Sequence, residues 1–527
     1  MSSIIKSKSG NNVYLYESES YREGGKVKNR RRIIGKVDPI SGQHVFKPEY
    51  IEEKGIHTLG DTVQETKLYT VNDVKQSITK EYGAFYLLNE IAEQIGLTDA
   101  LASVMPTAWK EVLNLAFYVV VSGEPASYCE DWLYKSECHP CKKLSSQRIS
   151  ELLVTLSQSD RLDFFERWGE FRCENEYIAL DITSVSTYSE LINDAEWGYN
   201  RDKEKLPQIN ICMLLGEKSR LPILQVIYSG SLKDVSTLKN TLQIASNLNF
   251  ENMSVVMDKG FASTKNINAM LSQISAIRFL IALPFSMAFA KNQVDSETQN
   301  IDCVDNAIVV GSDVLRGIVK RRSWNSEHDV YVHIYFNPDT SLQARNKLYA
   351  KVHGLVDQMK QEPAKYFNNS DVKKYLIVRK SDKNDIDYTI NIQHDVIANE
   401  LAYAGWLVLI SNHEDNAEDA IHLYRDKDVV EKGFLRLKNC LDMARLRVHS
   451  DNAMQNKVFI GFVALIIMAH IHNIMTENRL YRYWSVKKMI KILERLKVHY
   501  IKNDRIVSPL TKDQKTIFKA FNIKYDL

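Results

Sequence analysis

The sequence has few cysteines, no recognisable leader and no apolar run long enough to cross a membrane. Seven cysteines in 527 residues exclude a disulfide scaffold and fit free thiols in a reducing cytoplasm, where we expect the protein to reside. The polar start, "MSSIIKSKSG", is unlike a signal peptide. The most apolar run, 458–469, is too short to span a bilayer, which takes about 20 residues, so we expect a buried helix there and no membrane partner.

Motifs for nucleotide binding and structural zinc are missing or incomplete. Neither GxGxxG nor GxxxxGK[ST] occurs, so we expect no nucleotide cofactor. The lone CxxC at 138–141 supplies two thiolates, whereas structural zinc needs four ligands. Cys129 and Cys173 are the nearest additional cysteines, and a zinc site is therefore the less favoured interpretation.

Positive charge is concentrated at the two ends of a chain whose net charge is only +2. Residues 1–36 contain nine lysines and arginines against three acidic residues, and residues 479–524 contain thirteen against three. Such basic segments favour a polyanionic partner, most commonly nucleic acid. Solvated faces balanced by acids elsewhere would give the same totals, so charge alone leaves both interpretations open.

Local patterns predict a chain of several segments, as its length also suggests. Alternating residues between glycine-containing turns indicate strands near the N-terminus, and a helical period follows them. The predicted division is a basic β-rich module over 1–75, a helical module over 76–160, an α/β core over 161–284 and 405–478, a β-rich insertion over 285–404, and a basic helical tail over 479–527.

The order of elements within 177–284 indicates the fold of this core. The strand "YIALDITSVSTYS" is followed by a hairpin of "QINICMLL" and "PILQVIYSG", then by the helix "STLKNTLQIASNL" and the strand "MSVVMD". Three antiparallel strands, a helical crossover and a further strand match a ribonuclease H-like fold, an α/β class with a mixed sheet and flanking helices. A doubly wound nucleotide-binding sheet is the alternative, but its phosphate loop is missing.

Two aspartates stand at the polar ends of apolar strands in this core. Asp181 follows "YIAL" and Asp258 follows "VVM". An ionised carboxylate beside a buried strand is costly unless a cation or hydrogen bonds compensate it. Either residue could instead cap the turn or helix that follows. Because both lie on strands expected to be neighbours, we interpret them as a candidate site for metal-dependent chemistry.

A third acid, Glu431, lies in the predicted helix "YRDKDVVEKGFLRLK". Tyr424, Glu431 and Lys438 recur every seven residues, about two helical turns, so one helix would present them on one side, with Lys427 next to them. An ion pair between Lys427 and Glu431 is the simpler alternative. Two strand carboxylates and one helix carboxylate could hold two Mg²⁺ or Mn²⁺ ions for in-line phosphoryl transfer.

Taken together these motifs resemble DDE transposases of bacterial insertion sequences, in the cut-and-paste group with a Tyr-x2-Arg-x3-Glu-x6-Lys signature. The likeness also includes "ALDITSVSTYS", "IYSGSLKD", "VVMDKGFAS" and "GWLVLISN". The resemblance implies that Asp181, Asp258 and Glu431 bind two catalytic metal ions, and that Tyr424 and Lys438 contact transposon-end DNA. Lys427 replaces the signature arginine, and a lysine lacks the bidentate fork of arginine.

Relatives of this group stack an extruded base on an aromatic side chain, which makes Trp324 and Trp406 candidates for DNA contact. Trp324 has basic neighbours in "KRRSWNSEH", whereas the apolar strand around Trp406 favours a core position. The implied protein binds the double-stranded inverted-repeat ends of its element, cleaves them and joins them to target DNA, as a homodimer and in association with the prokaryotic nucleoid. The resemblance also implies DNA binding and dimerisation for the helical module over 76–160. There are two alternatives. One is a nuclease or resolvase on the same fold that cuts without joining, and the other is a catalytically silent DNA-binding protein derived from a transposase.

Overall fold

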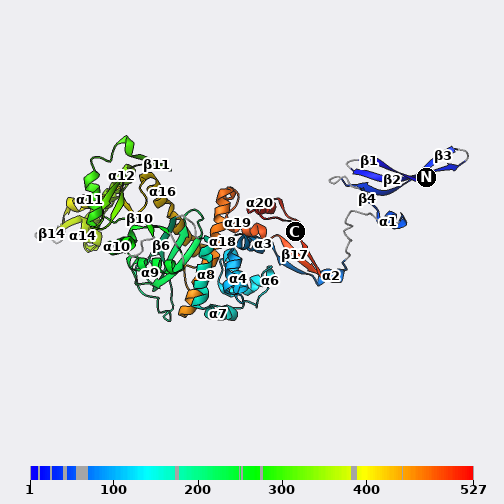
Figure 1. The fold of residues 1–527 in the computed structure, drawn as a ribbon, viewed down its shortest axis with the longest axis horizontal. Helices are drawn as coiled ribbons and strands as arrows, with labels where there is room; N and C mark the ends of the chain where they lie inside the picture. Colours follow the sequence, from blue (N-terminus) through cyan, green and yellow to red (C-terminus); the bar gives the residue numbers. More distant parts are fainter. Residues whose placement is uncertain are drawn as a thin grey trace. The chain divides into compact units, whose positions relative to one another are not determined.

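The computed structural model describes residues 2–9, 12–23, 26–38, 44–54, 69–172, 177–248, 250, 253–272, 277–380, 388–441 and 443–525. Residues 55–68 of the predicted N-terminal module, and Cys173, therefore lie outside the described residues. The chain divides into two compact units, Met1–Val74 and Lys75–Leu527 (Figure 1). The division of labour predicted among the five segments stays a prediction.

The first unit is an antiparallel sheet with one helix on it. Its strands follow the order β1-β2-β3-β4. Their bounds are Ser2–Ser9 for β1, Asn12–Glu23 for β2, Lys26–Val37 for β3 and His44–Phe46 for β4, followed by helix α1 at Pro48–Lys54 and the short helix α2 at Val71–Lys75. Leu15, Ile34 and Tyr50 form its buried core, so α1 covers the face of the sheet to which Leu15 belongs.

A mixed sheet of nine strands forms the centre of the second unit, in the order β11-β12-β13-β16-β10-β9-β6-β7-β8. The strands are β6 (Tyr177–Ser186), β7 (Gln208–Gly216), β8 (Pro222–Ser229), β9 (Ser254–Met257), β10 (Arg278–Ala282), β11 (Ala307–Val310), β12 (Asp313–Ser323), β13 (Asp329–Phe336) and β16 (Trp406–Ser411). Strands β6, β9 and β10 run parallel to one another, and the other neighbouring pairs are antiparallel. Strands from the predicted insertion thus extend the sheet of the predicted core.

Two helices cover one face of this sheet where the predicted acids lie. Helix α16 (Ala417–Asp426) packs on β9, β10 and β13, and α17 (Asp428–Asn439) packs on β6 and β7. Gly433 allows the close approach of α17, since a β-carbon there would lie 3.1 Å from the Leu215 side chain on β7. This glycine therefore has a packing role in a helix where it would otherwise cost about 1 kcal/mol.

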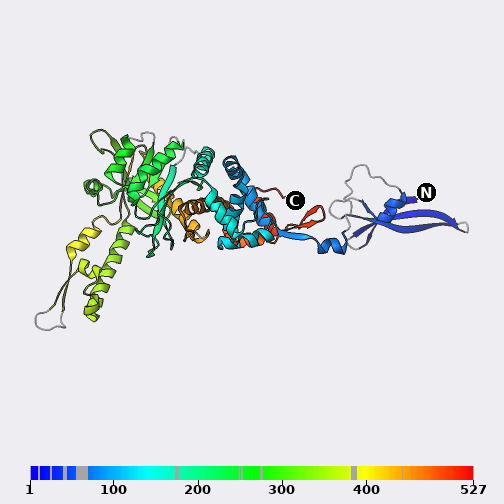
Figure 2. The ribbon, with the colours of Figure 1, turned by 90° about the horizontal axis from the view of Figure 1, so that it is seen from below.

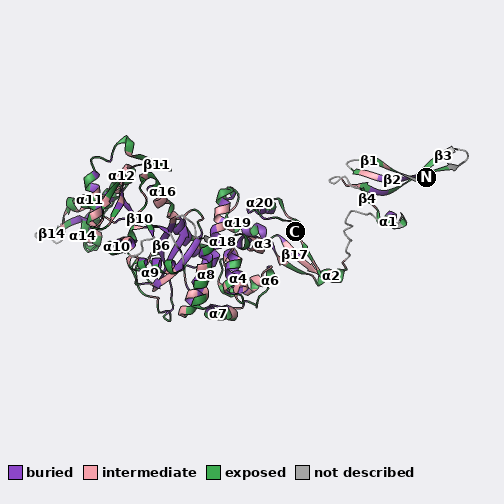
Figure 3. Cartoon of the chain, in the orientation of Figure 1, coloured by how far each residue is buried: buried purple, intermediate pink, exposed green. Residues whose placement is uncertain are grey.

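The helices before the sheet share one hydrophobic core with it. They are α3 (Gly83–Gln94), α4 (Leu97–Val104), α5 (Trp109–Ser122), α6 (Cys129–Lys135), α7 (Ser146–Thr155) and α8 (Gln158–Arg172). Three further helices connect strands of the sheet: α9 (Asp234–Asn247) lies between β8 and β9, α10 (Thr264–Ser272) between β9 and β10, and α11 (Ala288–Glu297) between β10 and β11. Buried side chains from Tyr82 to Ile523 form a single continuous cluster. The segments predicted as helical module and core are thus packed into one body, and Figure 3 shows its strands around β6 as buried.

Helix α18 (Asp451–Glu477) is the central helix of that core. By length and composition alone it could cross a membrane, and among the described residues it is the one such helix. In the structure, however, 78% of its most apolar stretch is buried against the rest of the protein, including α5, α7 and β8. The buried helix predicted around 458–469 is therefore present and extends beyond that run.

The C-terminal segment contains more than the predicted helices. Helices α19 (Val486–Leu493) and α20 (Lys512–Ala520) flank a hairpin of β17 (Lys497–Ile501) and β18 (Asp504–Val507). Strand β17 pairs with β5 (Ile78–Glu81) from the start of the second unit. A wholly helical tail is therefore a wrong prediction, because backbone pairing with a strand distant in sequence stabilises the short segment "KVHYI" as β-structure.

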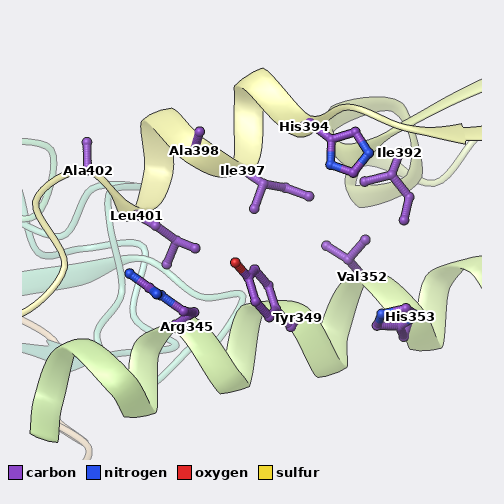
Figure 4. Close-up of a pocket in the computed structure, with 10 residues that line it drawn as sticks. All are labelled: Arg345, Tyr349, Val352, His353, Ile392, His394, Ile397, Ala398, Leu401 and Ala402. Atoms are coloured by element: carbon purple, nitrogen blue, oxygen red, sulfur yellow. The ribbon is translucent and has the colours of Figure 1, made fainter.

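A separate lobe interrupts the chain between β13 and β16. It consists of α12 (Pro338–Gln361), α13 (Pro363–Tyr366), α14 (Ser370–Tyr375), β14 (Leu376–Lys380), β15 (Tyr388–Ile392) and α15 (His394–Leu401), and it has its own small hydrophobic core. Figure 2 shows α12 beside the β14–β15 hairpin. A cavity of 720 Å³ lies between α12, which contributes Tyr349 and His353 to its lining, and α15, which contributes His394 (Figure 4). None of the predicted site residues lines it.

Candidate active site

Asp181 and Asp258 lie side by side on neighbouring strands. Parallel pairing places Leu180 of β6 opposite Met257 of β9, so the next residue on each strand is one of the two aspartates. Side chains alternate between the faces of a sheet, so both aspartates point to the face covered by α16 and α17. The predicted proximity of the two acids is thus present in the structure. The predicted strand-end position is wrong for Asp181, however, because β6 continues past it to Ser186 in register with β7, and only Asp258 follows the end of its strand.

The environment of Asp181 opposes its ionisation. Burial raises the pKa of Asp181 to about 6, and the negative charge of Asp258 adds to the rise. A hydrogen bond of 2.7 Å from the Ile182 amide to Oδ1 and the positive charges of Arg201 and Lys427 act in the opposite direction on this pKa. Perturbed pKa values of this kind cluster at functional sites, and two adjacent carboxylates attract a cation, so the pair of aspartates is a candidate cation site.

Asp258 has two donors on one oxygen. Its Oδ1 accepts 2.8 Å from the Lys259 amide, at the start of a 3-10 turn over Lys259–Phe261, and 2.9 Å from the Tyr424 hydroxyl on α16. Burial, followed by the charge of Asp258, raises the pKa of Tyr424, so the hydroxyl remains a donor. Asp258 therefore caps a turn, as the simpler interpretation predicts, and is also held by a side chain of the helix that covers the site.

The predicted single helix over 424–438 is wrong in one respect, because it is broken at Lys427. Helix α16 ends at Asp426 and α17 begins at Asp428. Lys427 is the junction, with its carbonyl accepting from the Val430 amide at 3.0 Å. The seven-residue spacing of Tyr424 and Glu431 is therefore not a repeat along one straight helix. The break instead lies where the covering helices pass from β9 to β6, above the two aspartates.

Lys427 lies among the site's acidic and phenolic groups. Its Nζ is 3.8 Å from Glu431 Oε1 and 5.2 Å from the centre of the Tyr424 ring. The lysine side chain is 14% exposed, whereas that of Glu431 is 59% exposed. The ion pair considered as the simpler alternative is therefore present. Its lysine is largely buried, and the charge of Lys427 also lowers the pKa of Asp181.

The three predicted metal ligands differ in how closely they converge. The negative charges of Asp258, Glu431 and Asp181 all contribute to the raised pKa of Tyr424, which places them around one phenol. Within the part of the chain that the structure describes, no three His, Cys, Asp or Glu side chains are close enough to form a ready metal centre, and this includes the CxxC segment. Two adjacent aspartates fit Mg²⁺ or Mn²⁺, because hard oxygen ligands suit these ions and Mg²⁺ commonly uses one or two carboxylates.

Lys438 points toward the segment between β6 and β7. Its Nζ lies 2.6 Å from Asp202 in this segment, and its side chain is only 10% exposed. Of the signature residues, Tyr424 and Lys427 thus lie beside the aspartates and Glu431 lies beside Lys427, whereas Lys438 is held by a separate ion pair. A contact between Lys438 and DNA stays a prediction.

The two predicted tryptophans are partly buried and engaged by protein groups. Trp324 donates its indole N–H to Asn268 Oδ1 at 2.7 Å, and its ring meets Phe289 edge to face. Trp406 packs on Phe336, with ring centres 4.8 Å apart. Strand register carries Trp324 toward the end of the sheet opposite the aspartates, whereas Trp406 begins a strand at their end. Their role at DNA also stays a prediction.

Sequence reasoning missed two residues that support the site. Arg201 lowers the pKa of Asp181 by its charge and forms an ion pair with Asp234, at 2.6 Å. Asp234 in turn lies next to Gly260, two residues after Asp258. Asp234 ends the motif "IYSGSLKD", which could have identified it. No sequence signal marks Arg201, because it lies in the segment between strands.

Comparison with known proteins gives one family match. A family model described as a transposase DDE domain matches residues 173–467. No curated protein matches the chain. Among solved structures, a cryo-EM structure of a piggyBac transposase synaptic complex with hairpin DNA has 10% sequence identity and a TM-score of 0.34, over 77% of this chain and 70% of that chain.

Proposed function

The chain belongs to the DDE transposase family, and from this premise we propose that it binds the inverted-repeat ends of its own mobile element, cleaves them and joins them to target DNA. The observation that carries the proposal is the pair Asp181 and Asp258 on adjacent parallel strands, beneath the junction of α16 and α17. Glu431 completes the proposed triad from the helix that follows this junction.

The proposed core is ribonuclease H-like. The strand order β8-β7-β6-β9-β10 supports it, because three antiparallel strands are followed, after the helix α9, by two strands parallel to the first. The alternative doubly wound sheet would join its strands by parallel crossovers throughout. In the proposed fold, the site lies where β9 ends beside the middle of β6.

We assign Asp181, Asp258 and Glu431 as ligands of two Mg²⁺ or Mn²⁺ ions. When bound, the ions would activate the attacking oxygen and stabilise the leaving oxygen. Tyr424 holds Asp258 in position through its hydroxyl, and Lys427 offsets the negative charge around Asp181. These two residues therefore position and balance the carboxylates, in addition to the DNA contacts proposed for them.

The proposed partners are double-stranded element ends and target DNA, bound by a homodimer at the prokaryotic nucleoid. Lys438, Trp324 and Trp406 are retained as proposed DNA contacts, and phosphate contacts from the basic ends would make the affinity fall with salt. The experiment is cleavage of duplex carrying the inverted repeats that flank the gene, in Mg²⁺, compared with a duplex of scrambled ends. We expect cuts at the repeat ends alone, and cutting of both duplexes alike would contradict end-specific transposase activity.

Replacing Tyr424 by phenylalanine tests its positioning role. The variant removes the 2.9 Å hydrogen bond to Asp258 but keeps the ring beneath Lys427. We expect cleavage to slow by about tenfold, the equivalent of one hydrogen bond, with unchanged affinity for the ends. Tyr403→Phe is the matched control, because that hydroxyl donates to Asp295 elsewhere. A loss of end affinity without slower cleavage of bound DNA would assign Tyr424 to DNA contact instead.

Lys427 is tested by exchanging it for methionine and for arginine. Removing its charge raises the pKa of Asp181 further above its present value of about 6, because Lys427 lowers that pKa. A carboxyl with a higher pKa stays protonated up to a higher pH. The acid limb of the pH profile of cleavage should therefore shift to higher pH in Lys427→Met. Lys427→Arg keeps the charge and should leave the limb in place. Equal pH profiles for the two variants would refute the charge-balancing role.

A further inference from the structure

The strands β2 and β3 of the first unit form a ribbon that extends beyond its neighbours. Their pairing runs from Val13 opposite Val37 to Glu23 opposite Lys26. Strand β1 pairs with β2 only as far as Glu19, and β4 pairs with β3 only over 35–37. Among the described residues, the part of the ribbon beyond Glu19 is therefore two-stranded.

The two faces of this ribbon differ in chemistry. Glu17 pairs opposite Arg32 on the face covered by α1, where Arg32 also binds Glu53 and stacks over Tyr50. Side chains alternate along a strand, so the opposite face carries Asn29 and Arg31. Register places Ser20 opposite Asn29 and Ser18 opposite Arg31 on that same face.

The face opposite α1 presents polar side chains in a fixed arrangement. Asn29, Arg31 and Ser20 are exposed. The Ser20 hydroxyl donates to Asn29 Oδ1 at 2.6 Å, which orients the amide across the two strands. Arg31 lies two residues along the same strand, opposite Ser18, where β1 still borders β2, whereas Asn29 lies in the two-stranded part. A guanidinium and an oriented amide therefore project side by side where the sheet narrows to the two-stranded ribbon.

Resting on the proposed function, we propose that this face enters the major groove of the element ends and reads base edges with Asn29 and Arg31. The major groove is about 12 Å wide and admits a two-stranded β-ribbon, and there asparagine pairs with adenine and arginine with guanine in two-point contacts. The exposed Lys28 and Arg30 lie on the other face of the same strand and add positive charge near the flanking phosphates.

The test compares variants of the two faces in the full-length protein. Binding is measured without divalent metal to two probes: a duplex enriched from a randomised pool by the wild type, and a mixed-sequence duplex. Asn29→Ala with Arg31→Ala should lose at least about tenfold in affinity for the enriched duplex, with a much smaller loss for the mixed one. Arg30→Ala, on the opposite face of the same strand, should weaken both equally and modestly.

Two further measurements make the outcome decisive. Arg31→Lys keeps the charge and the strand but lacks the bidentate fork, so it should lose selectivity while retaining affinity for the mixed duplex. Guanines replaced by 7-deazaguanine lack the major-groove N7 acceptor, and wild-type affinity should fall on such a duplex. Unchanged selectivity in the double variant, no effect of 7-deazaguanine, or no selectivity in the wild type would each overturn the proposal.

Failure of this proposal is distinguishable from failure of the proposed function. A protein that selects DNA through Asn29 and Arg31 but never cleaves it would refute the transposase activity alone. A protein that cleaves element ends, with the double variant choosing them as well as the wild type does, would refute the ribbon alone.

Discussion

Replacing Asp258 with asparagine is expected to slow DNA cleavage by at least about a thousandfold while leaving affinity for the element ends unchanged. Asparagine keeps the oxygen that accepts from the Lys259 amide and the Tyr424 hydroxyl, and it caps turns as well as aspartate does. What is lost is the negative charge beside Asp181, on which the proposed cation binding depends. Cleavage and binding are measured on the same labelled duplex.

The matched control for this substitution is Asp160→Asn. Asp160 also caps its own chain, accepting 2.7 Å from the Ser157 amide at the start of α8, but it takes no part in the site. We expect the control to cleave at the wild-type rate. Cleavage by Asp258→Asn within a few fold of wild type would show that Asp258 is not a ligand of the catalytic ions.

The second large effect is expected at Asn456, which joins the helices of the N-terminal half to α18. Its fully buried amide donates to the Leu153 and Leu156 carbonyls at 2.8 and 2.9 Å, and its Oδ1 accepts from Arg161 at 2.5 Å. Asn456→Leu leaves these groups without that partner, including a buried guanidinium whose pKa is already lowered by burial. We expect the free energy of unfolding to fall by about 4 kcal/mol.

A double-mutant cycle separates this network from simple loss of packing. If the loss of stability comes from the Arg161 guanidinium left without its acceptor, the double variant Asn456→Leu with Arg161→Leu should be less destabilised than the sum of the two single changes predicts. Asn452→Ala, one turn earlier on the same side of α18, removes an exposed amide that donates to the Val154 carbonyl, and it should cost about 1 kcal/mol or less. Chemical denaturation of each variant supplies the values, and strictly additive effects would refute the network.

The strand-end aspartates could be predicted because their positions follow from local pattern. An apolar run that ends in an acid correctly places Asp258 at the end of β9. The same pattern misplaces the end of β6, which continues beyond Asp181 to Ser186, but the parallel pairing of the two strands still brings the acids together. The break at Lys427 could not be predicted in this way, because no glycine or proline marks it. It arises from tertiary packing: α16 follows β9 and β10 while α17 follows β6 and β7, and strands of a twisted sheet differ in direction.

Contacts between distant segments explain the other differences. The basic neighbours of Trp324 suggested DNA contact, but Asn268, more than fifty residues earlier in the sequence, binds its indole N–H. Strand β17 exists because β5, over four hundred residues earlier, supplies a partner edge. Arg201 reaches Asp181 from a segment without periodicity. In each case a side chain or backbone edge remote in sequence determines the result, and one sequence read locally does not contain that information.

The central claim, that this chain both cuts and joins DNA at one carboxylate site, is tested most directly by strand transfer with pre-cleaved ends. Duplexes that already carry the terminal 3′-hydroxyl are incubated with wild type and with Glu431→Gln, in Mg²⁺ and supercoiled target DNA. We expect joined product from the wild type alone, with both proteins binding the ends equally. Hydrolysis by the wild type without any joined product would identify a nuclease, and joining by Glu431→Gln would remove Glu431 from the site.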